Sequence, residues 1–204
     1  MTVAPPISRY VAAWTASPFA RVELAWVATQ QAEELIWAAI PALGGDYHVS
    51  EGIAIHHLAR IEEGAVIKGP AIIGPGCFVA ANAYLRGGVY LDKNCIVGPA
   101  AELKTSFMFE GSKLAHLNFV GDSILGGSVN VEAGAMIANY RNEKTDKRIR
   151  IQFDGQGIDT GVEKFGALVG DESRIGANAV IAPGALLAPA SRVGRLELVD
   201  QYPA

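Results

Sequence analysis

Three basic residues, Lys68, Arg86 and Lys104, follow one another at equal intervals along the chain. Each comes directly after a large aliphatic residue, so a structure that repeats with this period would project all three from one edge. Stacked cations repel by roughly 1–4 kcal/mol per neighbouring pair. Either splayed, solvated side chains reduce that cost, or a bound anion such as a phosphate reverses it. We call these residues the basic ladder, and a phosphate site is one of its two interpretations.

The interval between these cations equals three repeats of a six-residue pattern. A period of six fits neither a helix of 3.6 residues per turn nor one long strand. It predicts short strands with a turn after each, three strands closing a triangular coil, and coils stacked as parallel strands about 4.7–4.9 Å apart. The aliphatic positions of the first run are Ile61, Ile67, Ile73, Val79, Leu85, Leu91, Val97 and Leu103.

This hexapeptide pattern resembles that of the left-handed parallel β-helix proteins, and the handedness is taken from the resemblance. The expected fold is therefore mainly β. Cys77 and Cys95 are separated by the same interval as the cations of the ladder, so they occupy the same inward position in successive coils. Their spacing permits a disulfide, whereas two buried reduced thiols are expected in a cytoplasmic protein.

The pattern breaks twice. The first break, residues 109–119, predicts a short loop that leaves the β-helix. The second, about residues 141–166, predicts a protruding β-hairpin, because residues 147–153 alternate basic and apolar side chains before a Gly-containing turn. Such a hairpin could cover a site, reach a neighbouring subunit or lie in solvent. Asp154 and Asp159 flank turns and are interpreted as turn residues.

The N-terminal part has a different character. Residues 21–40 contain neither Gly nor Pro, and their apolar residues recur at roughly helical spacing. We expect residues 1–46 to form an irregular arm and a capping helix, and residues 47–204 to form the β-helix domain. Whether the helix caps its own β-helix or a neighbour's stays open.

The composition excludes several classes of protein. A net charge of −4 argues against a nucleic-acid partner, and two cysteines are too few for a secreted disulfide scaffold. No apolar run is long enough to span a bilayer, so no membrane span is expected. The beginning of the chain contains Pro5, Pro6 and Pro18 and lacks a basic segment, so no signal peptide is expected and the predicted location is cytoplasmic.

A metal centre is not expected either. Some β-helix enzymes, the gamma-class carbonic anhydrases, hold zinc with three histidines. The four histidines of this chain do not show that family's spacing, and neighbours in a strand face opposite sides. These histidines are His48, His56, His57 and His116.

Residues 101–140 closely resemble the acetyltransferase domain of the bifunctional N-acetylglucosamine-1-phosphate uridyltransferase/glucosamine-1-phosphate N-acetyltransferase enzymes. The matching motifs are Glu102-Leu-Lys104, His116-Leu-x-x-Val-Gly-Asp122, and Asn130-x-x-Ala-Gly134 leading to Ala138-Asn-Tyr140. The insertion resembles that of the archaeal-type members. The resemblance covers roughly residues 47–190, and no nucleotidyltransferase domain is expected within this chain.

The resemblance implies a role for each matching residue. His116 would be the general base that takes a proton from the sugar amine. Glu102 would orient its imidazole, and the backbone N–H of Ala133 would face the developing oxyanion. Arg86 and Lys104 would hold the sugar phosphate, in agreement with the basic ladder.

The remaining contacts implied are to the sugar or the acetyl group, through Asn130, Asn139 and Tyr140. Phe119 stands where the family usually has Tyr, so one sugar hydrogen bond is lost or replaced. The resemblance also implies a homotrimer with sites between adjacent β-helices. Acetyl-coenzyme A would be a co-substrate, with no tightly bound cofactor. Its binding residues are unknown, and the C-terminal coils that help hold coenzyme A in this family are expected to be curtailed after Val193.

Three functions fit the sequence. The first is acyl-coenzyme A-dependent N-acylation of an amino-sugar phosphate or a nucleotide-linked amino sugar, with acetyl-coenzyme A as the expected donor. The second is acyl transfer with another donor or acceptor, such as a hydroxyacyl chain and a nucleotide sugar. The third is a non-catalytic trimeric subunit that binds a sugar phosphate or regulates.

Overall fold

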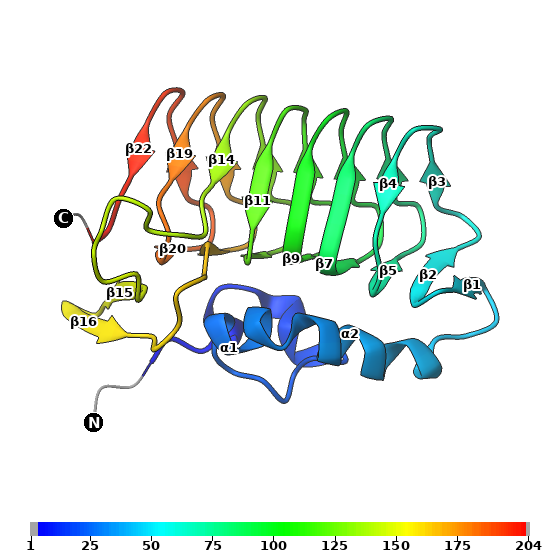
Figure 1. The fold of residues 1–204 in the computed structure, drawn as a ribbon, viewed down its shortest axis with the longest axis horizontal. Coiled ribbons are helices and arrows are strands. Elements are labelled where there is room, and N and C mark those ends of the chain that lie inside the picture. The colour runs from blue at the N-terminus through cyan, green and yellow to red at the C-terminus, as the bar shows by residue number, and fades with distance from the viewer. Residues whose placement is uncertain (1–3, 203–204) are drawn as a thin grey trace.

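Short strands stacked into a parallel β-helix make up most of the computed structural model, which describes residues 4–202 (Figure 1). Strands of successive coils pair in parallel, with Val79 opposite Val97 at the interval of the basic ladder. Farther along, Leu114 lies opposite Val131, so the coil between them is one residue shorter. The predicted left-handed β-helix of hexapeptide repeats is thus confirmed.

The coils have three faces, which we number in chain order. The first face contains β3 (Arg60–Ile61), β6 (Phe78–Val79), β8 (Ile96–Val97), β10 (Lys113–Leu114), β13 (Asn130–Val131), β18 (Arg174–Ile175) and β21 (Arg192–Val193). The second face contains β4 (Val66–Ile67), the first halves of β7 (Tyr84–Leu91) and β9 (Glu102–Met108), β11 (Phe119–Gly121), β14 (Met136–Ile137), β19 (Val180–Ile181) and β22 (Leu198–Val199). The third face contains β2 (Ile53–His56), β5 (Ala71–Ile73), the second halves of β7 and β9, β12 (Ile124–Leu125), β17 (Ala167–Val169) and β20 (Ala185–Leu187). Strand β1 (Tyr47–Ser50) pairs antiparallel with β2.

The interior of the β-helix is filled by the aliphatic positions that the repeat predicts. Those from Ile73 to Leu103 are fully buried, while Ile61 and Ile67 are partly buried against the same core. Cys77 and Cys95 are both buried and both free. The Cys77 thiol donates to the backbone oxygen of Asp92 at 2.7 Å, which agrees with two reduced thiols inside the coil.

The loop predicted for residues 109–119 is wrong, because the chain stays in the β-helix there. Strand β10 pairs with both β8 and β13, and Leu114 and Val120 lie in the core. The repeat is lost because two successive coils are each one residue shorter: Arg86 pairs with Lys104, but Val89 already pairs with Ser106, and Leu114 pairs with Val97 before it and Val131 after it. Two glycines of β7 therefore face the single residue Thr105 of β9, and counting in sixes loses its register.

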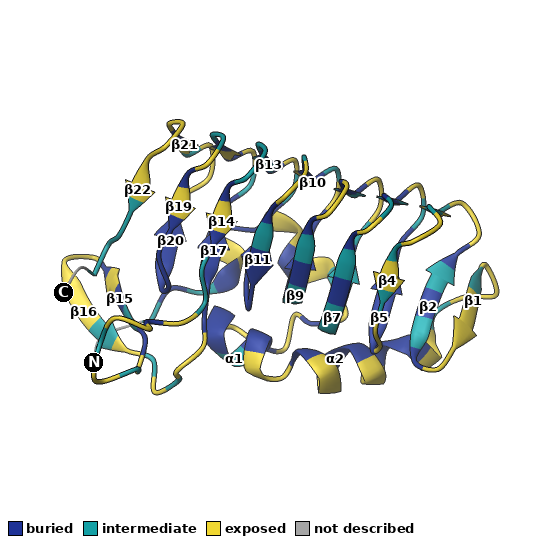
Figure 2. Ribbon diagram, turned by 45° about the horizontal axis from the view of Figure 1, so that its top comes forward, coloured by how far each residue is buried: buried dark blue, intermediate teal, exposed yellow. Residues whose placement is uncertain are grey.

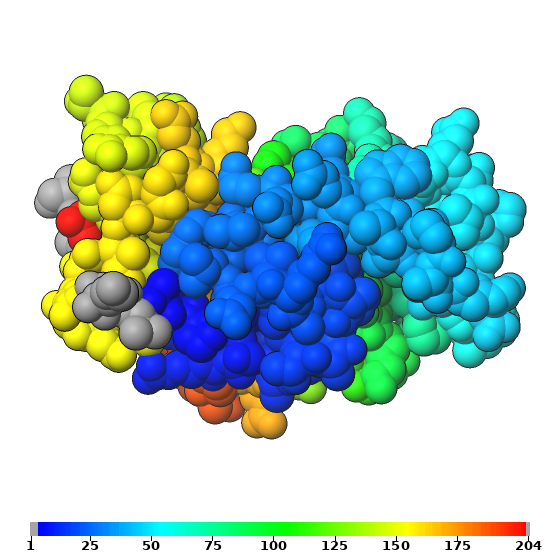
Figure 3. Space-filling model, turned by 90° about the horizontal axis from the view of Figure 1, so that it is seen from below, coloured from blue at the N-terminus to red at the C-terminus, as the bar shows by residue number. Residues whose placement is uncertain are grey.

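The N-terminal segment forms two short helices and not one. They are α1 (Ala25–Gln30) and α2 (Ala32–Ala39), separated at Gln31, with short 3₁₀ segments η1 (Ile7–Arg9), η2 (Ala12–Ala16) and η3 (Ile40–Ala42) around them. They run along the third face and not over an end of the β-helix (Figures 1 and 3). None of the helices within residues 4–202 is long and apolar enough to cross a membrane.

An apolar stripe on the outside of the third face explains this position. Its residues alternate with the inward ones and share a core with Trp14, Phe19 and Trp26 of the N-terminal segment. Phe107 lies at its centre, with ring centroids 5.0 Å from Phe19 and 5.8 Å from Trp14. The stripe consists of Ala54, Ile72, Tyr90, Phe107, Ile124, Leu168 and Leu186.

The predicted hairpin forms as β15 (Arg150–Phe153) and β16 (Gln156–Asp159). One side of it, with Ile149, Ile151 and Phe153, is buried in the same core as the stripe, and β15 contacts β20. The hairpin therefore lies against its own β-helix beside the N-terminal segment and does not stand free (Figure 3).

Arg141 connects the start of the insertion to the last coil. Arg141 is 4% exposed, and its guanidinium donates to both carboxylate oxygens of Asp200 at 2.7 Å and to the Pro183 backbone oxygen at 3.0 Å. The hydrogen bonds from Arg141 lower the pKa of Asp200 below its usual value. Figure 2 shows how this end of the molecule combines buried and exposed strands.

Replacing Phe107 with Ala should lower the free energy of unfolding by about 3–5 kcal/mol, because a large buried ring leaves a cavity between the N-terminal segment and the β-helix. Urea unfolding followed by circular dichroism measures the change. Leu58→Ala is the control, since Leu58 is 62% exposed and its truncation should have little effect. Equal effects of the two variants would contradict the proposed packing.

Asp200→Asn should destabilise the protein by about 1–3 kcal/mol at neutral pH, because the buried guanidinium of Arg141 loses its charged acceptor. Since the pKa of Asp200 is lowered in the folded protein, the pair stabilises the fold above about pH 4 and stops doing so as the pH falls through the lowered pKa. The gap in stability between wild type and variant should therefore narrow below about pH 4. Unfolding curves at several pH values test this, and a gap that widens on acidification would refute it.

Candidate functional site

The basic ladder lies on the second face, and two of its cations are paired with carboxylates. Arg86 and Lys104 are neighbours in register. The Arg86 guanidinium donates to Glu102 from Nε at 2.8 Å and from a terminal nitrogen at 2.7 Å. The Lys104 ammonium lies 2.8 Å from Asp122. Lys68 instead has its ammonium 5.2 Å from the centre of the Tyr84 ring. Arg86 and Lys104 are thus held in place by the protein.

Asp122 connects several of the predicted site residues. It is 2% exposed, and its carboxylate accepts hydrogen bonds from the Lys104 ammonium and from the side-chain amide of Asn139. The preceding residue, Gly121, leaves room for this arrangement: a Cβ there would lie 2.7 Å from Asn139 Nδ2 and 2.8 Å from the ring of Phe119. Lys104, Asn139 and Phe119 therefore gather around Gly121 and Asp122.

Sequence reasoning gave no role to Asp122, although a signal was present. The interval from Lys104 to Asp122 equals the interval from Arg86 to Lys104, and Lys104 and Asp122 form an ion pair between neighbouring coils. An acidic residue one coil beyond a basic one marks a cross-coil ion pair.

His116 and Ala133 lie in adjacent coils at the corner between the first and second faces. His116 is exposed, and its backbone oxygen accepts from the Gly134 N–H at 3.0 Å. Within residues 4–202 the His116 ring has no hydrogen-bond partner. The predicted partner of the ring, Glu102, pairs with Arg86 through one carboxylate oxygen, Oε1.

The backbone N–H of Ala133 lacks the carboxylate acceptor that the equivalent N–H has in other coils. At the same position of other coils, the N–H of Ala81 donates to Glu62 at 3.0 Å and the N–H of Ala177 donates to Glu132 at 2.9 Å. One coil before Ala133 the corresponding residue is Ala115, which has no carboxylate. Across the described part of the chain, no acceptor takes the Ala133 N–H.

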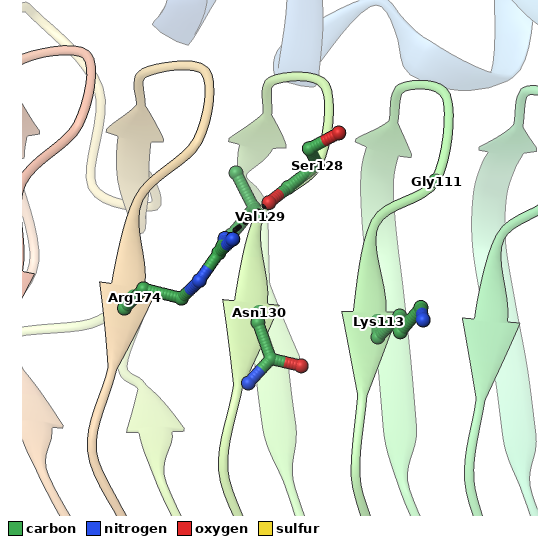
Figure 4. A pocket seen from close by; sticks show the side chains of 6 residues that line it. All are labelled: Gly111, Lys113, Ser128, Val129, Asn130 and Arg174. Atoms are coloured by element: carbon green, nitrogen blue, oxygen red, sulfur yellow. Dashed lines mark hydrogen bonds between the residues drawn. The ribbon is translucent and has the colours of Figure 1, made fainter.

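Asn130 lies elsewhere, on the first face. It lines a depression of about 370 Å³ with Lys113, Ser128 and Arg174 (Figure 4). The Arg174 guanidinium donates to the Ser128 backbone oxygen at 2.6 Å. Asn130 therefore does not meet Arg86 and Lys104 on the second face, and it faces a different, basic part of the surface.

Tyr140 follows Asn139 where the chain leaves the β-helix for the insertion. It is partly exposed, and the ammonium of Lys147 lies 5.4 Å from the centre of its ring. Lys147 also donates to the backbone oxygen of Asn142 at 2.7 Å. The insertion thus brings a cation next to the predicted sugar-binding residues.

Three ligand-type side chains meet far from this site, near strands β1 and β2. Donor atoms of Asp46, His56 and His57 all lie within 4.8 Å of one another, close enough to hold a metal ion. The expectation that adjacent histidines face opposite sides is wrong here, because β2 ends at His56 and the two rings stack at 4.5 Å. The His56 Nδ1 is already occupied, since it accepts from the Leu58 N–H at 3.1 Å.

Asp122→Ala should lower the free energy of unfolding by about 1–3 kcal/mol, because the largely buried ammonium of Lys104 and the amide of Asn139 lose their acceptor. The matched control is Glu110→Ala, which breaks an ion pair with Lys93 whose two side chains are each 51% exposed. That variant should change stability by less than about 1 kcal/mol. Chemical unfolding distinguishes them, and a neutral Asp122→Ala would show that this network is not structural.

Comparison with known proteins agrees with this fold. Residues 70–105 match a family model described as bacterial transferase hexapeptide (six repeats). The chain is 37% identical over 141 residues to a bifunctional sugar-1-phosphate nucleotidylyltransferase/acetyltransferase of Sulfurisphaera tokodaii, covering 69% of this chain and 35% of that protein. It is 32% identical over 160 residues to the bifunctional protein GlmU of Methanocaldococcus jannaschii, covering 70% and 38%.

A third relative is the bifunctional protein GlmU of Desulfitobacterium hafniense, 32% identical over 156 residues, with 76% of this chain and 28% of that protein covered. The chain thus spans about a third of the length of these relatives. The resemblance to the hexapeptide-repeat acyltransferases and to the acetyltransferase part of the bifunctional enzymes is confirmed, and both comparisons support an acyltransferase.

Proposed function

We propose that this hexapeptide-repeat protein is an acyl-coenzyme A-dependent N-acyltransferase, with acetyl-coenzyme A as donor and an amino-sugar phosphate as acceptor. The observation that carries the proposal is the corner at which the exposed His116 ring and the open Ala133 N–H lie in adjacent coils. One supplies a base and the other an oxyanion donor, which together are what acyl transfer to an amine requires.

The chemical step follows from these two groups. A neutral His116 imidazole removes a proton from the sugar amine as its nitrogen attacks the thioester carbonyl. The carbonyl oxygen gains negative charge and accepts a hydrogen bond from the Ala133 N–H. The tetrahedral intermediate then collapses, the C–S bond breaks, and the coenzyme A thiolate leaves and takes up the proton held by His116, which restores the neutral base.

The acceptor phosphate is assigned to Arg86 and Lys104. Glu102 and Asp122 hold these cations on the second face, so little side-chain freedom is lost when the phosphate binds. In this proposal Glu102 positions Arg86 and acts on His116 only through the acceptor. Asn139, Tyr140 and Phe119 border the sugar, while Asn130, on the first face, lies on the side of the acetyl group.

A homotrimer is part of the proposal. Large apolar side chains are exposed on the second face and its corner, where a contiguous apolar surface indicates an interface. The exposed side chains are Leu117, Met136, Val180, Leu196 and Leu198. Association there would place Arg86 and His116 between adjacent β-helices.

Since acetyl-coenzyme A is a cytoplasmic donor, we place the reaction in the cytoplasm.

His116→Ala should lower the turnover number by about 10²–10⁴-fold, the usual contribution of a general base. Free-thiol release from acetyl-coenzyme A, with glucosamine-1-phosphate or its galacto epimer as acceptor, measures it. His48→Ala is the matched control, because His48 is an exposed histidine of β1 outside this site. Circular dichroism checks that each variant is folded.

Each other outcome has a defined meaning. Unchanged turnover in His116→Ala would overturn the role of His116. Turnover with hydroxyacyl donors or nucleotide-linked acceptors alone would favour the alternative transferase, for which Phe119 is the supporting substitution. No turnover with any donor and acceptor of the panel would favour a non-catalytic sugar-phosphate-binding subunit.

A further inference from the structure

A buried asparagine interrupts a column of alanines at the corner between the first and second faces. Each coil turns there, and the last residue of the turn directly precedes a strand of the second face. Asn118 holds this position before β11, which lies between β9 and β14 (Figure 1). In other coils the same position is alanine, namely Ala65, Ala83, Ala101, Ala135 and Ala179.

The side chain of Asn118 binds the turn of the next coil. Its Nδ2 donates to the backbone oxygen of Glu132 at 2.7 Å and to that of Ala135 at 3.2 Å. Carbonyl oxygens only accept, so the atom that faces them is the amide nitrogen, and its two hydrogens match the two acceptors. These oxygens belong to the first and last residues of the turn 132–135, which also contains Ala133. Asn118 therefore holds both ends of the turn that carries the proposed oxyanion donor.

One of these hydrogen bonds falls on the peptide group that supplies the donor. The Glu132 oxygen and the Ala133 N–H belong to the same planar peptide and point in opposite directions. A donor fixed on the oxygen consequently fixes the direction of the N–H. It also polarises the peptide, which strengthens the N–H as a donor. Asn118 thus acts on the Ala133 N–H from the opposite end of the peptide.

The equivalent peptides of other coils are held from their N–H end. The N–H of Ala81 donates to the carboxylate of Glu62, and the N–H of Ala177 donates to that of Glu132. A carboxylate in this place would occupy the donor that acyl transfer requires. Asn118 holds the Ala133 peptide by its oxygen instead, which leaves the N–H available to a substrate.

The stability of the coil does not account for an asparagine at this corner. Asn118 is 3% exposed, and no donor within residues 4–202 reaches its buried Oδ1. A buried acceptor without a partner costs free energy, which offsets the two hydrogen bonds of Nδ2. Alanine avoids this cost at the other corners. The asparagine next to His116 and Ala133 therefore points to a role in the site.

We propose that Asn118 is a positioning residue for acyl transfer, which holds the Glu132–Ala133 peptide so that its N–H faces the thioester oxygen. The proposal rests on the proposed function. It assigns a role to a position that the His116 motif leaves open. Asn118 acts on the oxyanion donor and not on the base, so the dependence of the rate on pH should not change when Asn118 is replaced.

The test is the kinetics of Asn118→Ala, which introduces the residue found at the other corners. We expect kcat to fall about tenfold or more, because a misdirected oxyanion donor stabilises the transition state less. The KM values for glucosamine-1-phosphate and acetyl-coenzyme A should change less than about twofold, since Asn118 contacts neither in this proposal. The urea midpoint of unfolding and the pH at which kcat is half-maximal should both stay close to those of wild type.

Gln31→Ala is the control for loss of an amide side chain. Gln31 is exposed in the N-terminal segment, away from the corner between the first and second faces. This variant should change neither kcat nor either KM.

The outcomes separate this proposal from the proposed function. If wild type turns over and Asn118→Ala keeps its kcat, the positioning role is wrong and the function stands. A lower kcat that comes with a lower urea midpoint or a shifted pH profile would also overturn the role, because the effect would then arise from the fold or from His116. If wild type does not turn over, the function fails, and the crystal structures of wild type and Asn118→Ala decide: a rotated Glu132–Ala133 peptide in the variant supports the positioning, and an unchanged peptide overturns it.

Discussion

Stacking of parallel coils is the constraint on which the rest of this structure depends. Each residue stands above its counterpart one coil earlier, so a position repeated in the sequence becomes a column in space. Residues of like charge at a repeated position are therefore stacked on one another and repel. In the basic ladder of Lys68, Arg86 and Lys104, this repulsion is offset by ion pairs of Arg86 with Glu102 and of Lys104 with Asp122. The same stacking places His116 beside the Ala133 coil.

The fold could be predicted from the sequence wherever a column is uniform. Inward aliphatic residues at every sixth position indicate the β-helix without any distant contact. The prediction failed at residues 109–119, because Gly87 and Gly88 in one coil correspond to Thr105 alone in the next. The position of the N-terminal helices could not be derived from the hydrophobic pattern of residues 21–40, since it depends on the apolar stripe on the outside of the third face.

The candidate site divides in the same way. Arg86 and Lys104 were predictable from spacing, and His116 from a motif. The surroundings of Asp122 were not, because Gln30 and Glu33 come from the N-terminal helices and Lys164 from the end of the insertion, and only the folded chain brings them to one hollow with Asp122. Nor was the pairing of Glu102 with Arg86 predicted, since the family resemblance implied that this carboxylate orients His116.

The N-terminal segment also changes how the molecule can come apart. In a solenoid each repeat contacts its immediate neighbours, so end coils can fray independently of the middle. Here the single helix α2 contacts three strands of successive coils, β5, β7 and β9. The apolar stripe of the third face, on which the whole N-terminal segment packs, continues to β17 and β20. A segment bound across so many coils couples them to one another beyond nearest neighbours. The repeat array thereby acquires the cooperativity of a globular domain, and its binding surfaces keep their shape as one unit.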